Sequence, residues 1–216
     1  MSLSKKTKKL FFDRYLYKIA VWTPLASYYR GNDTEKTRTQ LDRYTNEMLS
    51  TGRTEVYVGN SWNRSRYSLN EVYRDLAMVA LIESQPDSIL RIEGTTLSFY
   101  TNDESAIDTV EELYDHNVKE VAKPENDKVK EFLLANPKSI LREEFTHKYR
   151  VTINPISDST SFKDWAAQLP KIKVMRNDYR LGGYFYVADL KTLSMCRLFL
   201  ADKIRRIDEL HTSKEI

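Results

Sequence analysis

Apolar and polar residues alternate with period two at Tyr17–Val21, which predicts a β-strand with one buried face. From Asn32 to Met48, apolar residues recur at helical spacing, so a helix should follow this strand after a turn. A second strand is expected at Ile89–Ile92, and Leu97–Asp103 has the pattern of a third strand that ends at a helix-capping aspartate. A helix and a last short strand complete the order β-α-β-β-α-β, which is that of the ferredoxin-like fold.

The second half of the chain repeats this pattern. Tyr149–Ile153 alternates in the same way as the first strand, and a helix at Ser161–Leu169 and a strand at Ile172–Met175 follow it. Three further residues recur at a constant offset of 86 positions, so that Phe99, Tyr100 and Asp103 match Phe185, Tyr186 and Asp189. The match continues without a gap through the next helix, as far as Val121 and Ile207. An internal duplication explains this agreement.

We therefore predict an α+β protein built from two tandem ferredoxin-like units. The boundaries that follow from the pattern are residues 10–123 for the first unit, 124–145 for a helical connector and 146–216 for the second unit. The first unit has an insertion at about 51–86, in which a β-hairpin around Gly59–Ser61 precedes a helix capped by Asn70. The basic segment Met1–Lys9 is expected to be a solvated tail.

The composition is that of a folded protein in a reducing compartment. Hydrophobic residues make up 41% and charged residues 30% of the 216 positions, which argues against a disordered chain. The single cysteine, Cys196, excludes an intrachain disulfide and a cysteine-based zinc site, so a cytoplasmic location is expected. The longest apolar run, near Leu76–Ile82, is much shorter than the ~20 residues that span a bilayer. We therefore expect no membrane partner, and no signal peptide because charged residues directly follow Leu10–Phe12.

Catalytic chemistry has little support in the sequence. No phosphate-binding glycine loop, nucleophile elbow or zinc-protease motif is present. The three histidines, His116, His147 and His211, are too far apart to have the spacing of metal ligands. Asp103 and Asp189 stand where helix caps are expected. No catalytic, cofactor-binding or metal-binding residue is predicted, no cofactor is expected, and the protein is interpreted as non-enzymatic.

The outward faces of the predicted sheets carry most of the candidate binding residues. In the second unit, alternation directs six apolar residues toward the helices: Val151, Ile153, Ile172, Val174, Phe185 and Val187. Basic and aromatic residues occupy the opposite faces, and the candidates are Lys18, Arg91, Tyr100, Arg150, Lys173, Tyr184 and Tyr186. Three positions agree in type between the units, which pairs Lys18 with Arg150, Arg91 with Lys173 and Tyr100 with Tyr186. The net charge of +3 is too small to indicate a polyanion partner, so the distribution of charge is the better guide.

The inserted hairpin supplies three more candidates, Trp62, Arg64 and Arg66, around its turn. A large ring beside two guanidinium groups suits either single-stranded nucleic acid or a protein-binding hot spot. The alternative is that Trp62 folds back against the inserted helix.

Two families share features with this chain. The segment Arg180–Val187 is similar to the third-strand signature of RNA-recognition modules, from which it departs at Leu181 and Phe185. This similarity implies shared chemistry, with bases stacked on rings and phosphates neutralised by Lys and Arg. Tandem ferredoxin-like units also resemble CRISPR RNA-processing endonucleases, whose glycine-rich loop has no counterpart here because Ala201–Lys203 lacks glycine. The second resemblance therefore concerns the fold alone.

Two functions remain open at this level. One hypothesis is the binding of single-stranded RNA or DNA by the sheet faces and the hairpin. The other is a protein-interaction or assembly module, such as a homodimer, in which the sheet faces are buried.

Overall fold

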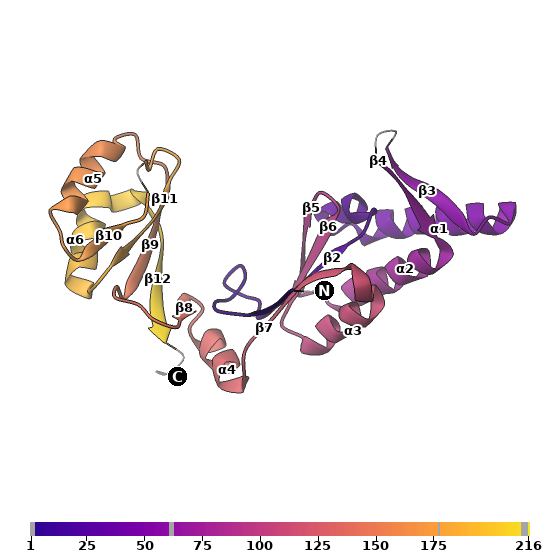
Figure 1. Ribbon diagram of the computed structural model, residues 1–216, viewed down its shortest axis with the longest axis horizontal. Helices are drawn as coiled ribbons and strands as arrows, with labels where there is room; N and C mark the ends of the chain where they lie inside the picture. Colours follow the sequence, from indigo (N-terminus) through magenta and orange to yellow (C-terminus); the bar gives the residue numbers. More distant parts are fainter. Residues whose placement is uncertain (1–2, 61–62, 177, 213–215) are drawn as a thin grey trace. The chain divides into compact units, whose positions relative to one another are not determined.

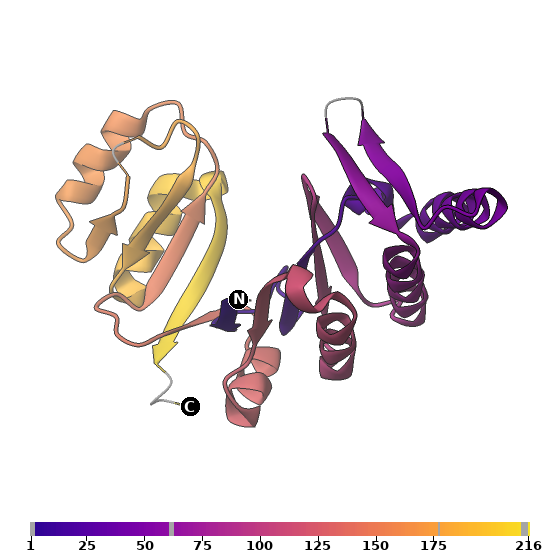
Figure 2. The same ribbon diagram turned by 45° about the vertical axis from the view of Figure 1, so that its right-hand side comes forward.

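The computed structural model describes residues 3–60, 63–176, 178–212 and 216. The chain divides into two compact units (Figures 1 and 2). The first contains Met1–Thr7 and Arg14–Glu125, and the second contains Lys8–Asp13 and Asn126–Ile216. Each unit has one five-stranded sheet with helices beside it, so the protein is of the α+β class.

The first unit has the strand order β1-β7-β2-β6-β5, in which β1 runs parallel to β7 and the other pairs are antiparallel. Its strands are β1 (Leu3–Lys6), β2 (Tyr17–Trp22), β5 (Ile89–Glu93), β6 (Thr96–Thr101) and β7 (Val118–Lys123). A separate hairpin consists of β3 (Glu55–Asn60) and β4 (Asn63–Ser68). The helices are η1 (Ala26–Asn32), α1 (Thr34–Thr51), α2 (Leu69–Ser84), α3 (Glu104–Tyr114) and η2 (Asp115–Asn117).

Local sequence signals explain where the inserted elements begin and end. The Asp33 carboxylate accepts from the backbone of Lys36 and begins α1, and Gly52 ends that helix in the left-handed conformation, at φ 66°. Ser68 and Glu71 form a capping box at the start of α2. Ser68, and not Asn70 as predicted, is therefore the cap, and the insertion consists of the hairpin and α2.

The second unit has the strand order β10-β11-β9-β12-β8, in which β8 runs parallel to β12. Its strands are β8 (Ser139–Arg142), β9 (Tyr149–Ile153), β10 (Ile172–Val174), β11 (Gly183–Val187) and β12 (Ile204–Thr212). Its helices are α4 (Asp127–Ala135), α5 (Ser159–Ala167), α6 (Leu190–Leu200) and η3 (Ala201–Lys203). The segment 124–145, predicted to be a connector, contains α4 and β8, and from Asn126 it lies in the second unit.

The two sheets are similar in strand order and in register. Lys18 lies opposite Tyr100 in the first sheet, and Arg150 lies opposite Tyr186 in the second. The pairing of β2 with β7 shifts register between Glu120 and Val118, and that of β9 with β12 shifts between Ile204 and Arg206, 86 residues further along. The offset of 86 residues therefore relates backbone positions as well as residue types.

Both sheets have an edge strand that the sequence analysis missed. The segment Leu3–Lys6, predicted to be a solvated tail, is exposed to solvent but pairs with β7 as a strand, so the prediction of a tail is wrong. Ser139–Arg142 occupies the corresponding edge beside β12. Neither segment has a clear alternation of apolar and polar residues, because the side chains of β1 are all exposed and β8 is only four residues long.

The core of the second unit lies between the sheet and helices α5 and α6, which cover the same face of the sheet (Figure 1). Of the six residues predicted to face the helices, Val151, Ile153, Phe185 and Val187 are buried in this core, and Ile172 and Val174 are partly buried and pack against it. Helix α5 contributes Phe162, and α6 contributes Leu193 and Cys196. None of the helices described is both long enough and apolar enough to cross a membrane.

Candidate ligand-binding surface

Tyr184 and Tyr186 lie on the face of the second sheet that is opposite to α5 and α6. Their neighbour Phe185 belongs to the core on the helix side. Tyr186 instead packs with Ile140 and Leu210 in a separate small cluster, against which Tyr184 also packs. Alternation along β11 therefore places these tyrosines on the side that the sequence predicts.

Arginine side chains cover the two tyrosine rings. The guanidinium carbon of Arg150 lies 4.2 Å from the centroid of the Tyr184 ring, and that of Arg142 lies 4.9 Å from the Tyr186 ring. Arg142 also donates a hydrogen bond to the Tyr186 hydroxyl, and Tyr186 is only 6% exposed. A base can stack on the covered face of Tyr186 only if the guanidinium moves, so this ring is a poor stacking platform.

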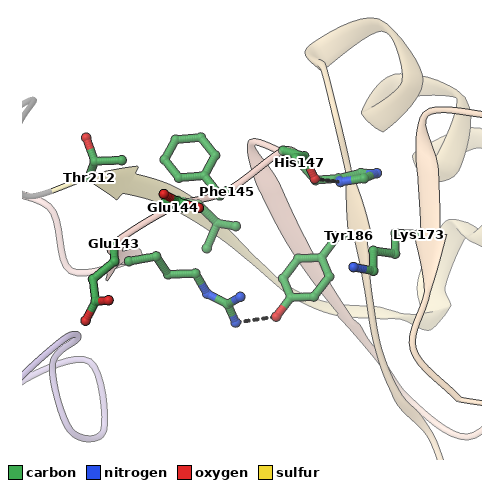
Figure 3. A pocket seen from close by; sticks show the side chains of 10 residues that line it. Glu143, Glu144, Phe145, His147, Lys173, Tyr186 and Thr212 are labelled. Carbon is green, nitrogen blue, oxygen red and sulfur yellow. Dashed lines mark hydrogen bonds between the residues drawn. The ribbon is translucent and has the colours of Figure 1, made fainter.

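A hollow of about 600 Å³ lies beside Tyr186 (Figure 3). The residues that line it come from β8, the β8–β9 loop and the neighbouring strands: Arg142, Glu143, Glu144, Phe145, Thr146, His147, Lys173, Tyr186, Leu210 and Thr212. Lys173 is paired with Tyr186 in the sheet, and its side chain points toward the tyrosine in Figure 3. Phe145 and His147 are half-buried, so their rings form part of the wall.

The charges around this hollow are mixed. Burial, and then the charge of Lys173, hold the pKa of His147 below its usual range. Since the usual pKa is about 6.5, His147 is neutral at neutral pH and presents an uncharged ring. Arg142 and Lys173 therefore supply the positive charge, and Glu143 and Glu144 line the same hollow.

A second hollow of about 450 Å³ shares Arg142, Glu143 and Glu144 with the first. Its other lining residues are Lys8, Lys9, Ile140, Leu141 and Arg150. The Lys8 ammonium lies 3.7 Å from the Glu143 carboxylate. The Nε of Arg150 is buried and has no hydrogen-bond partner in the part of the chain that the structure describes. Together the two hollows bring five basic side chains to one surface: Lys8, Lys9, Arg142, Arg150 and Lys173.

The equivalent face of the first unit has a different charge arrangement. Lys18 lies opposite Tyr100, as Arg150 lies opposite Tyr186. The Lys18 ammonium is 2.9 Å from the Glu120 carboxylate, which also binds Lys5 at 2.6 Å. Two cations therefore share one carboxylate on this face.

The predicted equivalence of Arg91 and Lys173 is wrong. Lys173 is paired with Tyr186, whereas the residue of β5 paired with Tyr100 is Ile89. Arg91 lies two residues after Ile89 on β5 and is paired with Ser98. Its guanidinium is 2.7 Å from the Glu93 carboxylate. The sequence pattern matched Arg91 to Lys173 instead of Ile89. The match is uncertain from sequence because β5 and β10 are short and are followed by loops of different length.

The hairpin of the first unit exposes an aromatic and basic face. Tyr57 is 63% exposed and lies opposite Arg66, and Arg64 is also exposed. The guanidinium of Arg66 is 3.9 Å from the Glu55 carboxylate. Trp62, the remaining candidate, lies outside the described residues.

Several residues whose side chains could take part in catalysis have structural roles instead. The Asp103 carboxylate accepts from the backbone of Ser105, and that of Asp189 accepts from Thr192, so both cap helices as predicted. A hydrogen bond from Lys171, and then the capping bond from the backbone of Thr192, lower the pKa of Asp189. Burial raises the pKa of the Cys196 thiol to about 11, so this thiol is a weak nucleophile. Within the described residues, no group of His, Cys, Asp and Glu is arranged to hold a metal ion.

Gly182 has a backbone explanation and needs no phosphate ligand. Its φ of +75° lies in the left-handed region, and an added Cβ would come within 2.8 Å of the Ile153 carbonyl oxygen.

Asp75 is fully buried in the first unit, at the centre of a polar cluster that the sequence analysis missed. Its carboxylate accepts hydrogen bonds from the hydroxyl groups of Tyr67 (2.5 Å), Thr23 (3.0 Å) and Tyr114. The Nε of Arg74 is 3.3 Å from the same carboxylate. These partners belong to four different segments, so the cluster ties the inserted α2 and hairpin to α3 and to Thr23, the residue that follows β2.

The cluster shifts the titration of its tyrosines. Burial, and then the charge of Asp75, raise the pKa values of Tyr67, Tyr114 and Tyr29. Asp75 interrupts the apolar stripe of α2 between Val72 and Val79, and this was the one sequence signal that could have revealed it. Its partners are distant in sequence and could not be inferred.

Comparison with known proteins identified no relative. No family model, curated protein or solved structure matches this chain.

Proposed function

We propose that this protein is a non-enzymatic binding protein of the cytoplasm, and that the second unit binds single-stranded RNA or DNA on the sheet face described above. The observation that carries this proposal is the group of five basic side chains around two adjoining hollows: Lys8, Lys9, Arg142, Arg150 and Lys173. A flexible polyanion is the ligand class that such an extended basic surface suits.

The residues of the larger hollow would have separate roles. Arg142 and Lys173 would neutralise phosphates, and an acceptor oxygen would satisfy the buried Nε of Arg150. Phe145 and the neutral ring of His147, rather than Tyr186, would stack on bases. Glu143 and Glu144 would repel a polyanion, so the strand should follow the opposite wall of the hollow.

The hairpin of the first unit would add a second contact. Tyr57, Arg64 and Arg66 are exposed on one ribbon, as expected for a surface that contacts bases and phosphates. Arg91 is exposed on β5 of the same unit. Lys18 and Tyr100 support the proposal less, since Lys18 is paired with Glu120 and Tyr100 is 6% exposed.

The fold supports an interpretation as two ferredoxin-like units that arose by internal duplication. The strand orders β7-β2-β6-β5 and β12-β9-β11-β10 are those expected of βαββαβ units, with one parallel edge strand added to each. The similar register of the two sheets supports the duplication.

Binding of a fluorescently labelled single-stranded oligonucleotide, measured by anisotropy at several salt concentrations, tests the proposed function. If three to five cations contact phosphates, log K should fall with log salt at a slope of about −2 to −3.5. Absence of binding at low salt would refute the proposal. A salt-insensitive dimer in which the Tyr184 face is buried would favour the assembly hypothesis instead.

A further inference from the structure

One edge of the second sheet is only partly covered by a neighbouring strand. Strand β12 pairs with β9 from Ile204 to Glu209, whereas β8 pairs only with Glu209–Thr212 (Figure 1). Within the described residues, the part of β12 from Arg205 to Asp208 therefore has a paired strand on one side only. The amide and carbonyl groups along such an open edge can pair with another extended chain.

The first unit shows what this position can hold. There β1 pairs with β7 from Glu120 onward, and the equivalent of Glu120 at the offset of 86 residues is Arg206. In the second unit, β8 begins its pairing only at Glu209. The edge that β1 occupies in the first sheet is therefore open in the second. Because the two sheets share their register, the backbone at Arg206 is placed to accept a strand as its counterpart in β7 does.

A hollow of about 760 Å³ lies along this open edge. Its apolar lining comes from α6 and from the sheet, and consists of Leu190, Leu193, Tyr149, Ile204 and Ile207. Leu193 belongs to the core between the sheet and the helices, and Ile207 packs against that core. The hollow is therefore on the helix side of the sheet, where alternate side chains of an added strand would enter it.

The hollow also has positive charges without counterions. Three exposed cations line it, and none of them forms an ion pair with a described residue: Lys138, Arg197 and Arg205. The one carboxylate among the described lining residues, that of Glu209, is 3.1 Å from the Lys148 ammonium. Arg206 is already bound to two aspartates. The hollow therefore combines an apolar floor with three uncompensated cations.

These cations lie at the two ends of the hollow. Helix α6 leads directly through η3 into β12, so Arg197 in the last turn of the helix and Arg205 at the start of the strand share one end. Lys138 lies at the other end, where its carbonyl accepts from the backbone amide of Glu209 at 3.0 Å. Ile207 lies between the two ends on β12. The order along the edge is positive, apolar, positive.

We propose that this edge binds an extended acidic segment of a partner protein, which pairs with Arg205–Asp208 and continues the sheet. Every second side chain of such a segment faces the hollow. An acidic residue would lie near Arg205, an apolar residue over Ile207 and a second acidic residue near Lys138. In this mode of recognition, main-chain hydrogen bonds provide affinity and the pockets for alternate side chains provide specificity.

The charges favour an acidic partner segment over the edge strand of a second copy. In the first sheet β1 is basic, and its Lys5 ammonium binds the Glu120 carboxylate of β7 at 2.6 Å. The same strand from a second copy would bring Lys5 and Lys6 toward the three cations of the hollow. Like charges across an interface are unfavourable, so the complement of this edge is an acidic strand.

This site is distinct from the proposed nucleic-acid surface and does not depend on it. It lies on the helix side of the second sheet, whereas Tyr184 and Tyr186 lie on the opposite side. None of the described residues that line it also lines either hollow beside Arg142.

Fluorescence anisotropy with the full chain tests the proposal, with the labelled peptide Thr-Glu-Thr-Val-Thr-Glu-Thr as the probe. The wild-type chain should bind this peptide, and Arg197→Gln with Arg205→Gln should weaken binding at least tenfold. Both side chains are exposed and without ion pairs, so this variant should fold normally. The matched control is Lys163→Gln with Lys191→Gln, which removes two cations of α5 and α6 outside the hollow and should bind as the wild type does.

Backbone pairing is tested on the probe itself. Only alternate amides of an added strand point toward β12. N-methylation of one alternate set should therefore abolish binding, whereas N-methylation of the other set should leave it intact. Equal affinity of the two methylated peptides would overturn the proposal, as would failure of the wild-type chain to bind the unmethylated probe. The Arg197/Arg205 variant should keep wild-type affinity for an oligonucleotide. Loss of that affinity with peptide binding unchanged would assign the hollow to nucleic acid and also overturn the proposal.

Discussion

The hydroxyl of Tyr186 accepts a hydrogen bond from the guanidinium group of Arg142, which also lies 4.9 Å from the centroid of the same ring. This pair links β11 to the edge strand β8, and it forms one wall of the larger hollow. The tyrosine thus holds the arginine in place and is itself largely covered. Its role on this surface is to position a cation rather than to stack on a base.

Tyr186→Phe tests this relationship, because it keeps the ring and removes the acceptor. The free energy of unfolding of the second unit should fall by about 0.5–1.5 kcal/mol, as expected for one hydrogen bond. Urea denaturation followed by circular dichroism measures the change. Tyr184→Phe is the matched control, since it removes a hydroxyl from the neighbouring ring and leaves the bond to Arg142 in place. An equal loss in both variants would contradict a specific role for the Arg142–Tyr186 bond.

Asp75→Asn should destabilise the first unit strongly. The amide keeps the size of the side chain but leaves the half-buried Arg74 with only the more distant Glu71 carboxylate, at 4.0 Å, and the Tyr67 and Tyr114 hydroxyl groups with a poorer acceptor. Removal of one partner from a buried ion pair costs about 3–5 kcal/mol. Urea denaturation measures the loss, and Asp87→Asn, at an aspartate whose side chain is 89% exposed, should change stability little. A loss below about 1 kcal/mol in Asp75→Asn would show that the cluster does not hold the insertion in place.

The same cluster predicts lower stability in alkali. Tyr29, Tyr67 and Tyr114 have raised pKa values in the folded state, so above pH ~10 the unfolded chain has lost phenolic protons that the folded chain retains. The unfolded state then binds fewer protons, and the free energy of unfolding falls as the pH rises. Below that pH the contribution is complete. Urea midpoints measured between neutral pH and pH ~11 check this, and Tyr114→Phe should flatten the dependence.

Cys196 should react slowly with a thiol reagent in the native protein. It is buried, and burial raises the pKa of the thiol to about 11, so little thiolate exists at neutral pH. Because the chain has one cysteine, the absorbance change on reaction with a chromogenic disulfide reagent reports on this residue alone. The rate should rise sharply in urea at the unfolding transition. Rapid reaction of the native protein would show that the core around α6 opens readily.

Much of the fold could be predicted because period-two alternation is strong in the central strands. Val151 and Phe185 reach the helix-side core as their spacing requires, and Tyr186 lies on the other side. The edge strands β1 and β8 could not be predicted in this way. They are held by parallel pairing with β7 and β12, which are distant in sequence, and alternation does not report such pairing.

Part of the candidate site could also be predicted from period-two alternation. Alternation identified the side of the sheet on which Lys173 and Tyr186 lie. It did not identify Arg142, Phe145 and His147, because these residues belong to β8 and the loop that follows it and join the site only through the pairing of β8 with β12. The covering of the tyrosine rings by arginines likewise depends on this tertiary contact.

One double variant examines whether the basic face of the second unit binds single-stranded nucleic acid, as proposed. Arg142→Gln with Lys173→Gln removes both cations of the larger hollow, and Lys163→Gln removes a cation from α5 on the opposite side of the sheet as the matched control. The double variant should bind a labelled oligonucleotide at least tenfold more weakly at low salt, with a salt slope shallower by about 1.4, while the control keeps the wild-type affinity. Equal affinity of the double variant and the wild-type protein would show that this face does not bind the strand.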